Sequence, residues 1–234
     1  MNNYKKNKKI LENSFNYNEN MEHDACGVGL IASTNGKKSR KIVEYGIQAL
    51  KAIWHRGAVD ADGKSGDGAG IQIEIAPEFF NEKILATGHS PDTDKRICVG
   101  MIFLPRTDYS KQEKCREIIE SALLEENYNI YGWRQVPINP SVLGKTADQN
   151  RPEIAQVMFK KNSNLETNDL ERDLFETRKK IEKVARESQL DDFYICSFSS
   201  RSIVYKGMFL AEMLSDFYPD LNDEKLTSRF AIFH

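Results

Sequence analysis

The stretch DACGVGLIAS, residues 24–33, marks the point where the folded part of the chain begins. From Cys26 to Ser33 the residues are small or apolar, and this short run predicts a buried strand. Met1 to Ala25 are rich in lysine and asparagine, which is typical of a disordered or removable segment. We therefore expect a leader or propeptide over residues 1–25 and a folded domain over residues 26–234.

The composition of the 234 residues is that of a globular protein, with 40% hydrophobic residues. Thirty-three basic residues against 35 acidic ones leave a net charge of −2, which argues against nucleic acid as a partner. The longest apolar run, Ile97 to Leu104, is too short to span a membrane, and the lysine-rich start is unlike a secretory signal. We therefore expect a cytoplasmic protein that acts without a membrane.

The cysteines and histidines are scattered along the chain. Cys26, Cys98, Cys115 and Cys196 have no CxxC spacing, and the four histidines make no metal-ligand pair. We expect neither a metal site nor a disulfide framework. Cys98, Cys115 and Cys196 are interpreted as reduced core residues.

The pattern of apolar residues predicts an α+β domain. We expect helices near residues 40–55, after Pro77, near 108–126 and over 168–187, and strands near 71–76, 96–104, 128–136 and 153–159. Residues 193–199 and 201–207 resemble a hairpin around Ser200, and the apolar run 228–234 looks cut off. Three helices have apolar residues on a shared face. They are Val43, Ile47, Leu50 and Trp54 in the first, Cys115, Ile118, Ile119 and Ala122 in the helix near 108–126, and Leu170, Leu174, Ile181 and Val184 in the last.

Two glycine motifs suggest nucleotide binding, and both lack the required context. Gly27, Gly29 and Ala32 match G-x-G-x-x-A, but a polar tail precedes them where a strand is needed. Gly63-Lys64-Ser65 resembles the end of a phosphate-binding loop, but a helix precedes that loop and nearby aspartates would repel a phosphate. We interpret both matches as accidental.

Cys26 is the candidate nucleophile. If the chain is processed so that Cys26 becomes its first residue, the α-amine, with a pKa of about 7.7–8.0, can take the proton of a thiol whose pKa is about 8.5. The glycines that follow would let a substrate approach the backbone closely. The alternative is that Cys26 is an ordinary core cysteine of an apolar strand.

Four segments together carry a resemblance to a known family. They are DACGVGLIAS (24–33), HRGAVDADGKSGDGAGI (55–71), GWRQVP (132–137) and YKGM (205–208). They resemble, in order, the N-terminal class II glutamine amidotransferase domain of the glutamate synthase large chain. The segment AVDADGKS and the later GWRQVP look specific to the glutamate synthase branch.

The resemblance implies an N-terminal-nucleophile hydrolase fold, in which two antiparallel sheets pack between helix layers in an αββα sandwich. It implies cleavage after Ala25, attack of Cys26 on the side-chain amide of L-glutamine, and release of ammonia. Arg56 matches the family's HRG motif and is expected to support the N-terminal strand through its guanidinium; the alternative is a solvent-facing arginine. Trp54 and His55 are interpreted as structural, and Asp67 as part of a loop over the pocket.

The resemblance also concerns regions beyond this chain. In the full enzyme, a synthase region with FMN and an iron–sulfur cluster forms glutamate from 2-oxoglutarate, with electrons from ferredoxin or from a small NADPH-oxidising subunit. The family's substrate-binding arginine and oxyanion-hole Asn-Gly pair are expected beyond His234, so we expect a partial domain that is not active alone. The alternatives are a non-catalytic fragment or association module, or the amidotransferase domain of another class II enzyme.

Overall fold

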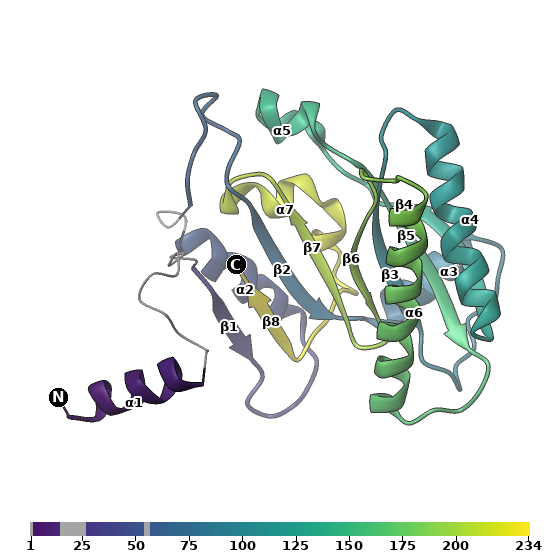
Figure 1. Cartoon of the computed structure of the whole chain (residues 1–234), viewed down its shortest axis with the longest axis horizontal. Coiled ribbons are helices and arrows are strands. Elements are labelled where there is room, and N and C mark those ends of the chain that lie inside the picture. Colours follow the sequence, from purple (N-terminus) through teal and green to yellow (C-terminus); the bar gives the residue numbers. More distant parts are fainter. Residues whose placement is uncertain (1, 15–26, 54–56) are drawn as a thin grey trace.

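Two antiparallel sheets of four strands each organise the part of the chain that the structure describes, residues 2–14, 27–53 and 57–234 of a computed structural model (Figure 1). The strands are β1 (Gly29–Ala32), β2 (Ala69–Glu74), β3 (Cys98–Leu104), β4 (Tyr128–Gln135), β5 (Glu153–Lys161), β6 (Tyr194–Ser199), β7 (Ser202–Gly207) and β8 (Phe230–Phe233). The α-helices are α1 (Asn2–Asn13), α2 (Arg40–Ala52), α3 (Pro77–Ala86), α4 (Tyr109–Glu125), α5 (Lys145–Gln149), α6 (Thr167–Glu187) and α7 (Leu214–Phe217). Short 3-10 helices lie at η2 (Pro140–Val142), η3 (Ala211–Met213) and η4 (Pro219–Asn222). The expected α+β class with two antiparallel sheets is confirmed.

The first sheet has the strand order β1-β8-β2-β7. β8 is inserted between β1 and β2, so that Ile232 lies opposite Leu30 on one side and opposite Gln72 on the other. Segments from the two ends of the sequence therefore lie side by side in one sheet (Figure 1).

The second sheet has the order β4-β5-β3-β6, and α4 and α6 pack on one of its faces. Ile102 of β3 and Val157 of β5 are completely buried against this helix layer. The expected face of α4 is present, because Cys115, Ile118 and Ile119 are buried.

The face of α6 differs from the expectation at one position. Leu170, Leu174 and Ile181 are buried as predicted, but Val184 is 43% exposed and Ala185 is buried in its place. At 3.6 residues per turn, a position four residues after Ile181 stays on the apolar stripe more closely than one three residues after it.

α2 begins at a side-chain cap and lies behind the first sheet in Figure 1. The Ser39 hydroxyl accepts a hydrogen bond from Lys41 N at 3.2 Å. The helix buries Val43, Ile47 and Leu50, as its periodicity predicts. Trp54, the fourth residue of the predicted face, lies outside the described residues.

Two sequence-based expectations about strands are wrong. β1 is an edge strand, and it alternates between half-buried and exposed residues; Leu30 is 61% exposed. The segments on either side of Ser200 do not pair as a hairpin, because β6 joins β3 in the second sheet and β7 joins β2 in the first. The turn between them therefore carries the chain from one sheet to the other.

Part of the expected leader is helical. Residues 2–13 form α1, which Figure 1 places outside the two sheets. These residues are therefore helical and not disordered, and the removal of residues 1–25 stays a prediction. No helix in the described ranges is long and apolar enough to cross a bilayer.

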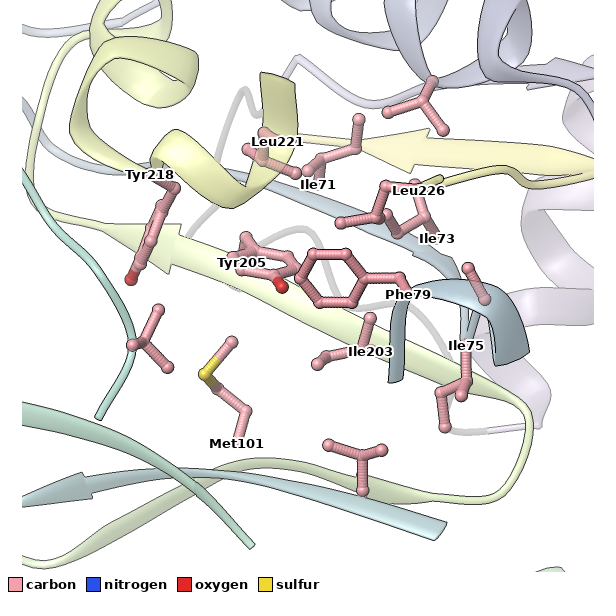
Figure 2. Packing of buried hydrophobic residues seen from close by; sticks show 14 of the residues in the cluster. Ile71, Ile73, Ile75, Phe79, Met101, Ile203, Tyr205, Tyr218, Leu221 and Leu226 are labelled. Carbon is pink, nitrogen blue, oxygen red and sulfur yellow. The ribbon is translucent and has the colours of Figure 1, made fainter. Parts of the chain in front are cut away.

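Side chains from both sheets share one apolar core. Figure 2 shows Ile203 and Tyr205 of β7 beside Met101 of β3, with Phe79 of α3 close to them. These four side chains are at most 1% exposed. Apolar burial of this kind is the main force that holds the two sheets together.

Candidate active site

Four strand ends meet at one end of the first sheet. Gly29 at the start of β1 lies opposite Phe233 at the end of β8, and Ala69 at the start of β2 lies opposite Gly207 at the end of β7. Two backbone hydrogen bonds extend this pairing: Gly70 N donates to His234 O at 2.9 Å, and His234 N donates to Gly70 O at 3.1 Å. The chain therefore enters β1 at the same end of the sheet at which β8 and β7 end and β2 begins.

A cavity of about 580 Å³ opens at this end of the sheet. Its walls include residues 67–72 of the loop and strand β2, residues 206–209 after β7 and residues 232–234 of β8. A further wall comes from Leu143, Ala147 and residues 150–152, close to α5. This volume lies within the range of about 300–1,000 Å³ that is usual for small-molecule sites.

The glycines here permit close contact between neighbouring chains. An added Cβ on Gly29 would lie 2.2 Å from the ring of Phe233, and one on Gly70 would lie 2.7 Å from Cβ of Lys206. Neither position can carry a side chain without moving its neighbour. Packing thus requires glycine at these two positions.

The loop before β2 is folded on itself by Asp62. Its Oδ1 accepts hydrogen bonds from Lys64 N at 2.9 Å and Ser65 N at 2.7 Å, and its Oδ2 accepts one from the Ser65 hydroxyl at 2.6 Å. These hydrogen bonds hold the pKa of Asp62 well below its ordinary value of 3.8, and the bond from the Ser65 hydroxyl has the largest effect. The carboxylate is therefore a fixed acceptor at neutral pH.

The same two side chains attach the loop to the N-terminus of α5. Thr146 N donates to Asp62 Oδ2 at 3.3 Å, and Ala147 N donates to Ser65 Oγ at 3.1 Å. Gly144, the N-cap of α5, has no capping side chain of its own, and a Cβ there would lie 2.2 Å from Asp62 Oδ2. The loop thus caps a helix that is distant in sequence and fixes one wall of the cavity.

A buried ionic network links the two sheets. Arg134 of β4 donates to both carboxylate oxygens of Asp220 at 2.9 and 2.8 Å, and Tyr205 OH donates to the same carboxylate at 3.2 Å. Gln156 Nε2 donates to Tyr205 OH at 3.4 Å. Burial, together with the Asp220 charge, raises the pKa of Tyr205 far above its ordinary value. This phenol therefore stays protonated and acts as a structural donor.

The structure places some predicted site residues and leaves others undescribed. Cys26 and Arg56, like Trp54 and His55, lie outside the described residues, so their predicted roles stay predictions. Asp67 lines the cavity, and its place in a loop over the catalytic pocket stays a prediction. Sequence reasoning missed the capping role of Asp62 and Ser65, for which the D-x-x-S spacing followed by a turn was the available signal.

The remaining cysteines are core residues, as predicted. Cys98, Cys115 and Cys196 are free thiols with exposures of 0%, 1% and 9%. Burial raises the pKa of Cys115 and of Cys196 to about 11, and that of Cys98 still further. Such thiols are poor nucleophiles and poor metal ligands at neutral pH. No group of three metal-binding side chains is found among the described residues.

Comparison with known proteins gives a consistent result. The family model described as "Glutamine amidotransferases class-II" matches residues 26–234. The glutamate synthase [NADPH] large chain of Azospirillum brasilense is 53% identical over 218 residues, which cover 93% of this chain and 14% of that relative. The ferredoxin-dependent glutamate synthase of Pyropia yezoensis is 45% identical over 91% of this chain and 14% of its own length. The ferredoxin-dependent glutamate synthase 2 of Synechocystis sp. is 42% identical over 91% of this chain and 13% of its own length. The chain thus spans about one seventh of the length of these relatives.

Proposed function

The chain belongs to the class II glutamine amidotransferases, and we propose that it supplies the glutamine-hydrolysing part of a glutamate synthase with Cys26 as nucleophile. The observation that carries this proposal is the extent of the family match, which starts at Cys26 and continues to His234. The similarity to glutamate synthases of bacteria and algae supports the choice of glutamate synthase within the family.

The first half of the proposed reaction forms a thioester. After removal of residues 1–25, the free α-amine of Cys26 takes the thiol proton, and Sγ attacks the side-chain amide carbon of glutamine. The C–N bond of the resulting tetrahedral intermediate breaks, and the ammonium group returns its proton to the leaving nitrogen. Ammonia leaves, and a γ-glutamyl thioester remains on Cys26.

The second half regenerates the enzyme. A water molecule gives a proton to the α-amine and attacks the thioester carbonyl carbon. The C–S bond breaks, the sulfur is reprotonated, and glutamate leaves. The net change is hydrolysis of one amide bond, so neither an oxidant nor a reductant is needed in this part of the protein.

The described residues have a supporting role in this scheme. Phe233, which lines the first cavity, pairs with Gly29, three residues after Cys26, so the proposal places the nucleophile near this cavity. The Asp62–Ser65 attachment to α5 holds the loop that follows Arg56, whose guanidinium we assign to positioning of the N-terminal strand. Substrate-binding groups beyond His234 complete the site in this proposal.

The products have a proposed destination. Ammonia passes to the synthase region of a longer polypeptide, where FMN and an iron–sulfur cluster support the reductive formation of glutamate from 2-oxoglutarate. An iron–sulfur cluster needs cysteine thiolates, and the three described cysteines, buried and with raised pKa values, do not fit that role. We therefore assign the cluster to the synthase region. Electrons come from NADPH, through a small subunit, or from ferredoxin.

The experiment that tests this function compares two nitrogen sources in the full-length polypeptide. Cys26→Ala is expected to abolish glutamate synthesis from glutamine and to leave synthesis from added ammonium salt intact, because ammonia bypasses the thioester. Cys196→Ala, which removes a buried thiol, is the matched control and should retain both activities. Full glutamine-dependent activity in Cys26→Ala would refute the assignment.

A further inference from the structure

A second cavity lies toward the other end of β2, whose last residue, Glu74, is about 17 Å along the strand from Ala69 at about 3.3 Å per residue. It measures about 810 Å³ and is called the basic cleft below. Its lining includes Gln72 and Glu74 of β2, residues 92–93 and 95–97 before β3, Thr167 at the start of α6, the turn residues 200–202 and Arg229 before β8. Strands of the first sheet, the segments next to β3 and β6, and the start of α6 thus contribute to its walls.

Positive side chains outnumber negative ones in the basic cleft. Its cationic residues are Lys38, Lys95, Arg96, Arg201 and Arg229, and its acidic residues are Glu74 and Asp92. The surrounding chain has an overall charge of −2, so this local excess of cations is a feature of the cleft and not of the protein as a whole.

Both carboxylates of the cleft are already engaged. Glu74 accepts hydrogen bonds from Arg229 N at 2.6 Å, Nε at 2.9 Å and Nη2 at 2.6 Å, and its Oε1 lies 3.8 Å from Lys38 Nζ. Asp92 accepts a hydrogen bond from Lys160 Nζ at 2.6 Å. The charge of Asp92 also acts on Lys95, while no ion pair is formed between either carboxylate and Arg96 or Arg201.

Three cations of the cleft, Lys95, Arg96 and Arg201, form no close ion pair with a carboxylate among the described residues. Lys95 Nζ donates to the carbonyl of Asn162 and to the side chain of Asn164, and Arg201 Nη2 donates to Asn168 Oδ1, all of which are neutral acceptors. Arg96 is exposed and forms no ion pair with a described side chain. The three come from different segments, since Arg201 lies in the turn that links the sheets.

We propose that the basic cleft binds a small organic anion that carries two or more carboxylate or phosphate groups. The charge on Lys95, Arg96 and Arg201 calls for a multiply charged ligand, and arginine is well suited to bidentate contacts with either group. A single inorganic oxyanion would leave most of the 810 Å³ empty. The hydroxyls of Thr93, Thr167 and Ser202 supply further polar contacts along the lining.

The site is separate from the proposed amidotransferase function. It extends from Gln72 to the Glu74 end of β2, whereas the first cavity extends from Gln72 to the Ala69 end, so that Gln72 is their one shared wall residue. Binding in the basic cleft can therefore be tested without glutamine and without turnover. Failure of one proposal leaves the other intact.

The test is a titration of the ¹⁵N-labelled chain, followed by NMR, with two probes at matched ionic strength. Citrate represents polycarboxylates and fructose 1,6-bisphosphate represents phosphates, and acetate is the singly charged control. We expect saturable shifts confined to residues 92–97, 167–168, 200–202 and 229 with at least one probe. A preference for one probe identifies the chemical group.

Charge-reversal variants make the test specific. Arg96→Glu and Arg201→Glu should each weaken binding by about tenfold or more, since a charged hydrogen bond is lost. Lys183→Glu, on the exposed part of α6 and outside the cleft, makes the same change in net charge and should leave binding unchanged. Circular dichroism verifies that each variant is folded.

Three results would overturn the proposal. They are the absence of saturable shifts with both probes, shifts outside the cleft, and equal weakening by Lys183→Glu. If both cleft variants fail to fold, the proposal is judged by whether the shifts of the wild-type chain are saturable and confined to the cleft. Equal binding of acetate at the same concentrations would also count against a multiply charged ligand.

Discussion

Ser65 Oγ accepts a hydrogen bond at 3.1 Å from the backbone N–H of Ala147, a residue 82 positions later in the chain. Ser65 is 3% exposed and at the same time donates its hydroxyl hydrogen to Asp62. One side chain therefore closes the loop before β2 and caps α5. Asp67 and Ala147 both line the cavity at the Ala69 end of the first sheet. The contact between Ser65 and Ala147 therefore determines how two walls of this cavity meet.

Removal of the Ser65 hydroxyl should lower stability. Ser65→Ala leaves Ala147 N without its partner, and loss of a helix cap typically costs about 0.5–2 kcal/mol. Urea denaturation of the chain measures the change. Lys64→Ala, at an exposed neighbouring position, is the control and should change the free energy of unfolding by less than about 0.5 kcal/mol. Equal costs for the two variants would contradict the capping role.

The buried faces of the helices could be predicted from the sequence, whereas the contacts of the loop before β2 could not. Helix periodicity correctly placed Val43 and Leu174 in the core, because it depends on local geometry. It could not reveal the contact between Ser65 and Ala147, which depends on how distant segments meet. The same limit explains the wrong hairpin around Ser200: two adjacent apolar strands are compatible with either pairing, and tertiary packing sends them to different sheets.

The buried ion pair of Arg134 and Asp220 should contribute strongly to stability. Their side chains are 11% and 5% exposed, so Asp220→Asn would leave a buried cation without its counter-charge. Such a loss costs about 3–5 kcal/mol. In a double-mutant cycle, Arg134→Met combined with Asp220→Asn should cost less than the sum of the single changes. Additive costs in urea denaturation would show that the pair is not coupled.

Acid should weaken the fold partly through Glu74. Burial by itself would raise the pKa of this carboxyl, but hydrogen bonds from Arg229 outweigh it, and the net result is a pKa below the ordinary value of 4.5. Because the folded-state pKa is the lower one, the stabilisation is complete above the unfolded pKa and is lost as the pH falls through the folded pKa.

Glu74→Gln measures this contribution. At pH 7 we expect a loss of about 1–3 kcal/mol, the usual contribution of hydrogen bonds to a charged group. The difference from the wild type should shrink as the pH is lowered below 4.5. Glu187→Gln, at a position 64% exposed, serves as the control. A difference that stays constant from pH 7 to pH 3 would contradict the role of the charged form.

Cysteine reactivity should separate Cys26 from the other three thiols. Burial raises the pKa of Cys115 and Cys196 to about 11, and the fully buried Cys98 is less ionised still. A diazo-ketone analogue of glutamine should therefore label Cys26 in the full-length enzyme, with peptide mapping as the measurement. Labelling mainly at any of the buried positions would refute Cys26 as the nucleophile.

The mature protein should begin at Cys26. The proposed base is the α-amine of this residue, and it exists only after the peptide bond that follows Ala25 is cleaved. The start of the family match at residue 26 is consistent with this boundary. Intact-mass measurement of the active full-length enzyme should reveal the loss of residues 1–25. An Ala25→Pro variant, designed to block cleavage, should retain the leader and lose glutamine-dependent but not ammonia-dependent synthesis. An active enzyme that keeps its leader would exclude the α-amine as the base, and another group would then have to accept the thiol proton.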